Sequence, residues 1–114
     1  MDDQLRRELA ALRAELQARI SELERISAAA MASRAPVKLD QASVGRLSRM
    51  DAIQGQSMAL ETERRRVIER ARIADAIKRI DAGEYGNCTK CGEPIPKKRL
   101  DLDPATPTCV ACAR

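Results

Sequence analysis

The stretch Cys88-Thr-Lys-Cys91-Gly-Glu-Pro-Ile-Pro contains one Cys-x-x-Cys pair, and the later stretch Cys109-Val-Ala-Cys112 contains a second. These two pairs include all four cysteines of the 114-residue chain. Cys91 and Cys109 are separated by 17 residues, a spacing typical of four-thiolate zinc sites. Zinc favours four soft ligands in a tetrahedron, and each Cys-x-x-Cys turn supplies two of them from one short loop. Gly92 follows the second thiolate, where the turn needs a residue that tolerates positive φ. The sequence therefore predicts a closed, structural zinc site.

Other uses of the four cysteines have less support. Two disulfides would suit a secreted protein, but the chain opens without a secretory signal. A thioredoxin-like redox pair needs a βαβ pattern, and no such pattern is visible. A catalytic zinc keeps an open position and usually recruits histidine or a carboxylate, whereas the chain has no histidine. One structural Zn²⁺ bound by Cys88, Cys91, Cys109 and Cys112 is therefore the favoured interpretation.

Composition favours long helices over a large globular core. The chain has one Tyr and no Phe or Trp, and 33% of its residues are charged.

Its formal net charge of +4 is weakly basic, which permits nucleic-acid contact without demanding it. No apolar run approaches the ~18 residues of a membrane span. We therefore expect a cytoplasmic protein that makes no membrane contact.

A first helix is predicted over residues 3–33. Asp2 or Asp3 can cap its start, and Pro36 prevents it from continuing far beyond residue 33. Steps of three and four residues place an apolar stripe on one face of this helix. The stripe consists of Leu5, Leu9, Leu12, Leu16, Ile20, Leu23 and Ile26. Such a stripe is typical of one strand of a coiled coil.

A second helix is predicted to begin at a cap on Asp40 and to end at Gly83, which takes the left-handed capping conformation. Its apolar positions follow an imperfect heptad pattern. They are Leu47, Met50, Ile53, Leu60, Val67, Ala74 and Ile77. Two long helices joined by a short connection fold back on each other. In that arrangement residues near Ile26 would face the start of the second helix, and residues near Leu5 would face the turns around Val67.

The predicted fold is mainly α. An antiparallel two-helix coiled-coil hairpin occupies residues 1–82, with its tip at about residues 34–45, and a small four-cysteine zinc finger follows over residues 83–114. A single continuous helix that dimerises through its seam is the alternative, and Pro36 argues against it. We expect a monomer.

Two groups of basic residues are candidate binding surfaces. Successive residues of the run Arg64-Arg65-Arg66 point about 100° apart on a helix and have acidic partners three or four residues away, so a solvated, salt-bridged face is favoured. The second group is Lys97, Lys98 and Arg99 in the zinc loop, which is the better candidate for an anionic partner. Its alternative role is to compensate the negative charge of the zinc–tetrathiolate centre.

The motif Gly83-Glu-Tyr-Gly-x-Cys88-x-x-Cys91-Gly-Glu-Pro-Ile-Pro, followed by Arg99-Leu100, a proline and Cys109-x-x-Cys112, resembles the zinc finger of the DksA/TraR family of bacterial transcription regulators. Over residues 83–112 the resemblance rests on sequence, and over the preceding hairpin it rests on architecture. It implies binding to RNA polymerase rather than to DNA, with the hairpin in the secondary channel and the zinc module outside against the enzyme. Some members act with ppGpp, but no ppGpp site is assigned in this chain.

The family resemblance also implies a functional tip. The family's tip often reads Asp-x-x-Asp-x-Ala, and the nearest match is the stretch from Val37 to Ala42, which keeps Asp40 and Ala42 but has Val37 at the first acidic position. Asp51 is a competing candidate for the acting carboxylate. The predicted partner-binding residues of the tip are therefore Asp40, Ala42 and Asp51.

Two functions from different classes remain open. The first is a transcription regulator that binds RNA polymerase and has no catalytic activity. The second is a zinc-ribbon nucleic-acid binder whose helices dimerise or present the ribbon. Single-strand binders stack bases on aromatic side chains, and Tyr85 is the only aromatic residue, which favours the regulator. With the cysteines used for zinc, no catalytic set of residues is evident, so an enzyme is not expected.

Overall fold

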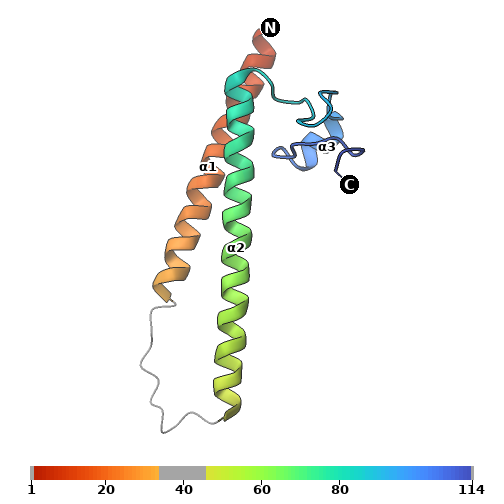
Figure 1. Ribbon diagram of the computed structural model, residues 1–114. Helices are drawn as coiled ribbons and strands as arrows, with labels where there is room; N and C mark the ends of the chain where they lie inside the picture. Colours follow the sequence, from red (N-terminus) through yellow and green to blue (C-terminus); the bar gives the residue numbers. More distant parts are fainter. Residues whose placement is uncertain (1, 34–45, 114) are drawn as a thin grey trace.

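Two long helices lie side by side and carry a small module at one end (Figure 1). The structure is a computed structural model that describes residues 2–33 and 46–113. Its elements are α1 (Asp3–Ser33), α2 (Arg46–Ala82) and the short α3 (Lys97–Leu102). The predicted fold class is confirmed: the protein is mainly helical, α1 and α2 pack on each other, and the cysteines cluster near the C-terminus.

The bounds of α1 coincide with the predicted range 3–33. Asp2 rather than Asp3 supplies the cap, because the Asp2 carboxylate accepts a hydrogen bond from the Gln4 amide at 3.3 Å. Asp3 lies in the first turn, where the helix dipole favours a negative charge. The predicted cap of the second helix, Asp40, lies outside the described residues.

The helices share one narrow apolar seam near the C-terminal module. Its buried members are Leu16, Leu23, Ile73, Ala76, Ile77 and Ala105, against which Leu12, Ile20 and Ile80 pack. The α1 side of this seam consists of the middle of the predicted stripe, with Leu23 exposing only 2% of its surface, whereas Leu5 at the start of the stripe exposes 44%. Because the chain has so few large apolar residues, this seam is the main hydrophobic contribution to stability.

The predicted stripe of α2 is wrong over most of its length. Met50, Ile53, Leu60 and Val67 expose 61%, 65%, 58% and 47% of their surface and take no part in the seam. Ile77 of the predicted stripe is buried, and Ile73 and Ala76, which the stripe did not include, form the rest of the buried face. Earlier in α2, the same side of the helix carries the partly buried Glu63, Arg66 and Arg70. The heptad pattern therefore indicated helix but not the face that packs on α1.

The predicted register of the hairpin is also wrong. Arg13 of α1 forms an ion pair with Asp81 at 2.8 Å, and Arg19 pairs with Glu69 at 3.1 Å. Near the end of α1, the hydroxyl of Ser27 accepts a hydrogen bond from Arg70 at 3.0 Å. Residues near Leu5 therefore lie beside the C-terminal end of α2, and residues near Ile26 lie beside its middle. The two helices are offset along their length, so α1 ends beside the middle of α2 and the first part of α2 extends past it (Figure 1).

The end of α2 follows the predicted pattern. Gly83 has φ +75°, a conformation that is strained for residues with a side chain. The Gly83 amide bonds to the Ile80 carbonyl at 3.1 Å, and the Glu84 amide bonds to the Arg79 carbonyl at 2.8 Å. These two bonds are those of a Schellman motif, which satisfies the last carbonyls of the helix and turns the chain toward the module.

Within residues 2–33 and 46–113, neither long helix has the continuous apolar stretch that a membrane span requires.

The seam generates a first prediction. Replacing the 7%-exposed Leu16 with Asp buries an unpaired carboxylate, and we expect the free energy of unfolding to fall by about 3 kcal/mol. Gln17→Asp is the matched control, because the adjacent Gln17 is exposed and its replacement alters only helix propensity, by less than about 1 kcal/mol. Urea unfolding followed by circular dichroism measures both changes. Equal effects of the two substitutions would contradict the seam.

Candidate metal centre

The first cysteine pair lies on a short hairpin of extended backbone. Asn87 and Pro94 form an antiparallel bridge, and the Ile95 amide bonds to the Gly86 carbonyl at 2.8 Å. Between them, the Cys88 amide bonds to the Glu93 carbonyl at 2.8 Å. The turn closes through a 2.9 Å bond from the amide of Gly92 to the carbonyl of Cys88, with Gly92 at φ +76° as the sequence predicted. This turn brings the side chains of Cys88 and Cys91 to the same side.

The second cysteine pair lies on a C-terminal turn. The amides of Cys112 and Ala113 bond to the Cys109 carbonyl at 3.2 and 3.0 Å. The two turns are tied together by a 2.9 Å bond from the Thr89 amide to the Pro107 carbonyl. Backbone hydrogen bonds thus shape each cysteine turn and hold the two turns next to each other.

The four thiols form one compact cluster. The Sγ atoms of Cys88, Cys91, Cys109 and Cys112 all lie within 4.8 Å of one another, and those of Cys91 and Cys109 are 3.7 Å apart. Zinc–sulfur bonds of about 2.3 Å in a tetrahedron place the sulfurs about 3.8 Å apart, so the cluster has the size of a zinc site. A disulfide would need about 2.05 Å, and all four cysteines are free thiols. The donor set therefore fits one structural Zn²⁺.

The electrostatics of the cluster also suit a cation. Hydrogen bonds from the backbone amides of Cys109 and Cys91 lower the pKa of the Cys88 thiol to about 6. Neighbouring thiols, Cys109 first among them, raise the pKa of Cys112 to about 12. The Cys88 thiol thus loses its proton readily, whereas the raised pKa of Cys112 disfavours a second thiolate beside it. A divalent cation at the centre removes that conflict, because it stabilises all four thiolates together.

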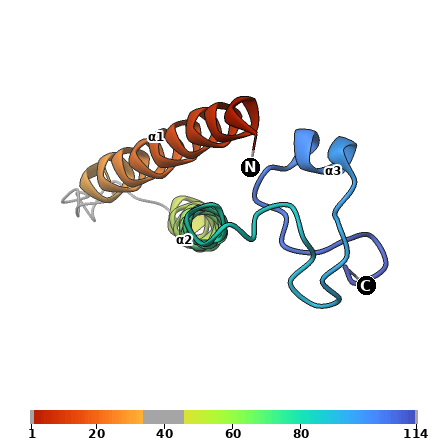
Figure 2. The same cartoon turned by 90° about the horizontal axis from the view of Figure 1, so that it is seen from above.

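The cysteine module packs on the base of the hairpin through the turn Asp103–Ala105. Ala105 is buried in the helical seam, and Asp103 pairs with Arg72 of α2 at 2.8 Å. The hydroxyl of Tyr85 donates to the Pro104 carbonyl at 2.9 Å, which fixes the turn from within the module. Figure 2 shows the module to one side of α2, close to the N-terminal end of α1. Sequence reasoning missed this contact, because a single small apolar residue between prolines gives no periodic signal.

The basic residues of the zinc loop have different environments. Lys97 and Lys98 begin α3 and are exposed. Arg99 is partly buried, and its Nε donates to the Thr108 carbonyl at 3.0 Å, next to Cys109. Arg99 thus supports the second cysteine turn, while the two lysines remain available to a partner. The helical form of this segment was not predicted.

The predicted tip residues are only partly within the described chain. Asp40 and Ala42 lie outside it. Asp51 lies in the first turns of α2, is exposed, and is at the opposite end of this helix from the cysteine module. Of the tip candidates, Asp51 therefore lies far from the metal centre.

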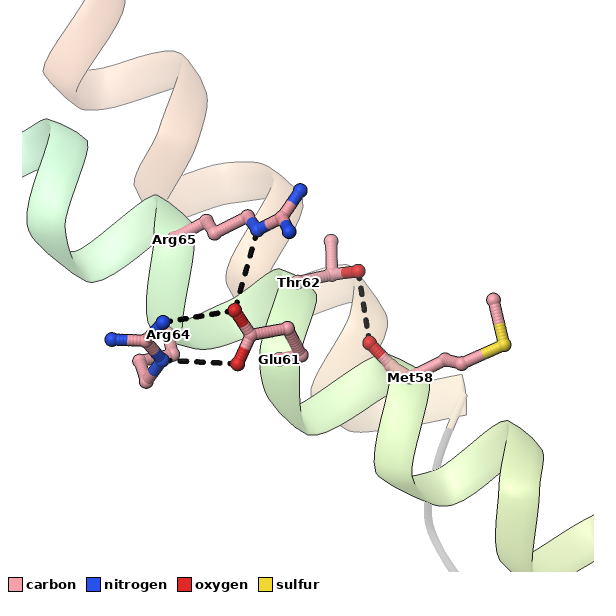
Figure 3. A network of polar contacts seen from close by, with 5 residues as sticks. All are labelled: Met58, Glu61, Thr62, Arg64 and Arg65. Atoms are coloured by element: carbon pink, nitrogen blue, oxygen red, sulfur yellow. Dashed lines mark hydrogen bonds and ion pairs between the residues drawn. The ribbon is translucent and has the colours of Figure 1, made fainter.

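The arginine run of α2 is a salt-bridged face, as predicted. Arg64 makes a two-bond contact with the Glu61 carboxylate at 2.9 and 3.0 Å, and Arg65 reaches the same carboxylate at 3.3 Å (Figure 3). The hydrogen bond from Arg64 lowers the pKa of Glu61. Arg66 pairs with Glu63 at 3.0 Å. These pairs engage the guanidinium groups along the helix and leave no converging set for a phosphate among the residues drawn in Figure 3.

Comparisons with known proteins agree with this geometry. Residues 83–114 match the family described as "Prokaryotic dksA/traR C4-type zinc finger". The solved structure of transcription factor DksA2 from Pseudomonas aeruginosa is similar to the whole chain, with a TM-score of 0.58 and 29% sequence identity. That similarity covers 97% of this chain and 78% of the DksA2 chain.

A curated relative is similar to a shorter part of the chain. An uncharacterized protein of Aquifex aeolicus (strain VF5) is 47% identical over 38 residues. This match covers 33% of the present chain and about a quarter, 26%, of the relative.

The metal centre generates the second prediction. We expect the purified protein to contain one zinc per chain, and Cys88→Ser to lose zinc together with the folded structure of residues 83–113. Zinc binding supplies on the order of 10 kcal/mol in small modules, more than the few buried residues of this module can replace. Metal analysis by mass spectrometry and protection from limited proteolysis measure the two effects.

The control for this prediction is Lys90→Ser, which changes an exposed residue between the first two cysteines and should leave the zinc content at one. A Cys88→Ser protein that keeps stoichiometric zinc and wild-type protection, or a wild-type protein with two disulfides and no zinc, would contradict the site.

Proposed function

Because the chain belongs to the DksA/TraR family of transcription regulators, we propose that it controls bacterial transcription by binding RNA polymerase, with its hairpin in the enzyme's secondary channel. The observation that carries this proposal is the architecture: the family's zinc module is attached at the base of a helical hairpin. A rod with a wider base is suited to enter a channel with its narrow end while the base rests outside.

We assign separate tasks to the two parts of the chain. In this proposal the hairpin, residues 1–82, extends into the secondary channel. The zinc module, residues 83–114, anchors the protein on the surface of the enzyme. Among the described residues, 2–33 and 46–113, the first part of α2 extends past the last turn of α1 and forms the far part of the rod. Asp51 lies on this far part, and Asp40 and Ala42 precede it in the chain. We propose that one of these carboxylates acts near the catalytic region of polymerase.

The exposed lysines of α3 complete the proposed contact. Lys97 and Lys98 carry two positive charges on the module's surface, whereas Arg99 is held by the Thr108 carbonyl. We propose that the lysines meet an acidic surface of polymerase. The protein acts as a cytoplasmic monomer without catalytic activity in this proposal.

Nucleic-acid binding by the zinc module has less support. Tyr85, the only aromatic residue, is partly buried and uses its hydroxyl on the Pro104 carbonyl. It is therefore poorly placed to stack on a base, which is the usual anchor for single strands.

The third prediction concerns polymerase and the tip. The immobilised protein should retain core RNA polymerase and not bare duplex DNA. Asp40→Asn and Asp51→Asn should bind polymerase as the wild type does, because each change removes one charge while keeping the size of the side chain, and Asp51 is exposed. In vitro transcription at matched occupancy should then reveal a weaker effect for the variant that lacks the acting carboxylate.

The outcomes of this experiment separate the assignments. Loss of effect in Asp51→Asn alone would place the functional tip on α2, and loss in Asp40→Asn alone would place it in the segment before α2. Wild-type activity of both variants would reject a carboxylate role. Retention of DNA but not of polymerase would reject the proposed function and favour the nucleic-acid binder.

A further inference from the structure

Arg79 has a guanidinium nitrogen that the rest of the described chain leaves without a partner. Within residues 2–33 and 46–113, Nη2 of Arg79 is buried from solvent and makes no hydrogen bond. Arg79 also forms no ion pair there, although Arg66, Arg70 and Arg72 of the same helix all do. A buried charged donor without an acceptor is costly, so its position calls for an explanation.

The position of Arg79 is fixed by the end of α2. Its carbonyl accepts the 2.8 Å bond from the Glu84 amide that closes the helix, so the residue lies where the chain turns into the cysteine module. Arg79 and Cys88 line the same cavity of about 290 Å³. The other residues of this cavity wall are Glu84, Asn87, Thr89 and Gly92. Arg79 is thus a residue of the hairpin that borders the first cysteine turn.

The charge of a loaded metal centre supplies the missing interaction. Zn²⁺ with four thiolates has a formal charge of −2, and thiolate ligands of zinc retain lone pairs that accept hydrogen bonds. Cys88 is the most buried ligand, with 3% of its surface exposed. Its Sγ accepts hydrogen bonds from the backbone amides of Cys109, Cys91 and Lys90, the last at 3.4 Å, and all of these donors lie in the two cysteine turns rather than in the hairpin. A nearby guanidinium can both compensate the charge and donate to the first cysteine turn.

We propose that Arg79 is a positioning residue of the zinc site: its guanidinium, held by the last turn of α2, stabilises the charged zinc–thiolate centre from the side of Cys88. Zinc loading is then coupled to the hairpin through one side chain, in addition to the Ala105 and Asp103 contacts. This inference depends on the metal centre and is independent of any partner of the protein.

The test uses the full-length protein and five variants. Arg79→Met removes the charge but keeps a long apolar side chain, Arg79→Gln keeps a neutral donor, and Arg79→Lys keeps the charge. Lys78→Met is the matched control, because Lys78 is exposed on the same turn. Zinc affinity is measured by competition with a chelator. The thiolate-to-metal charge-transfer band is measured after substitution with Co²⁺, since its energy reports hydrogen bonding to the sulfurs.

We expect Arg79→Met to bind zinc about 10-fold to 100-fold more weakly and to shift the charge-transfer band to lower energy. Arg79→Gln should be intermediate, Arg79→Lys should recover most of the affinity, and Lys78→Met should match the wild type. Arg72→Met, which breaks the ion pair to Asp103, should leave the band in place, so it distinguishes weaker packing of the module from a changed metal site.

Wild-type affinity and an unshifted band in both Arg79→Met and Arg79→Gln would overturn the inference. A loss of affinity in Arg79→Met with an unshifted band would also overturn it, because the effect would then be one of packing alone. If Arg79→Met fails to fold, Arg79→Gln decides the question by the same two measurements.

Discussion

Four thiolates hold together a C-terminal region that buries very little of its own surface. In residues 83–113, the buried side chains are those of Cys88, Ile95, Ala105 and Thr106. Burial of two aliphatic side chains contributes only a few kcal/mol, whereas zinc binding supplies on the order of 10 kcal/mol in small modules. The bond from the Thr89 amide to the Pro107 carbonyl, which joins the two cysteine turns, forms only while the turns are held together. The metal centre is therefore the constraint on which the fold of the module depends.

The module in turn completes the hairpin. Ala105 joins the seam of Leu16, Leu23, Ile73 and Ile77, so the best-packed part of the rod is the part that the module covers. Farther along, the contact between the helices becomes polar: Arg70 bonds to Ser27 and lies 3.9 Å from Glu63. Beyond that point α2 continues with exposed apolar side chains. Among the described residues, buried apolar contact between the helices thus decreases from the base toward the far end, and local stability is expected to decrease with it.

The sequence predicted the features that depend on local chemistry. Cysteine spacing, the positive φ of Gly83 and Gly92, and the length and buried face of α1 all follow from rules that act over a few residues. The register of the hairpin and the buried face of α2 could not be predicted in this way. Both depend on how far α2 extends past α1 and on the position of Ala105, a small residue that reaches the seam from outside the helices. Heptad spacing alone does not distinguish a face that packs on the partner helix from one that remains exposed, as Met50 and Ile53 do.

The central claim is that zinc organises residues 83–113 and that this module supports the base of the hairpin. Hydrogen–deuterium exchange of the full-length protein, with zinc bound and after its removal under reducing conditions, tests it most directly. The account predicts loss of amide protection throughout the module, faster exchange in the last turns of α2 next to Ala105, and little change in the part of α2 before Glu61. Protection of the Thr89 and Ile95 amides that survives zinc removal would contradict it.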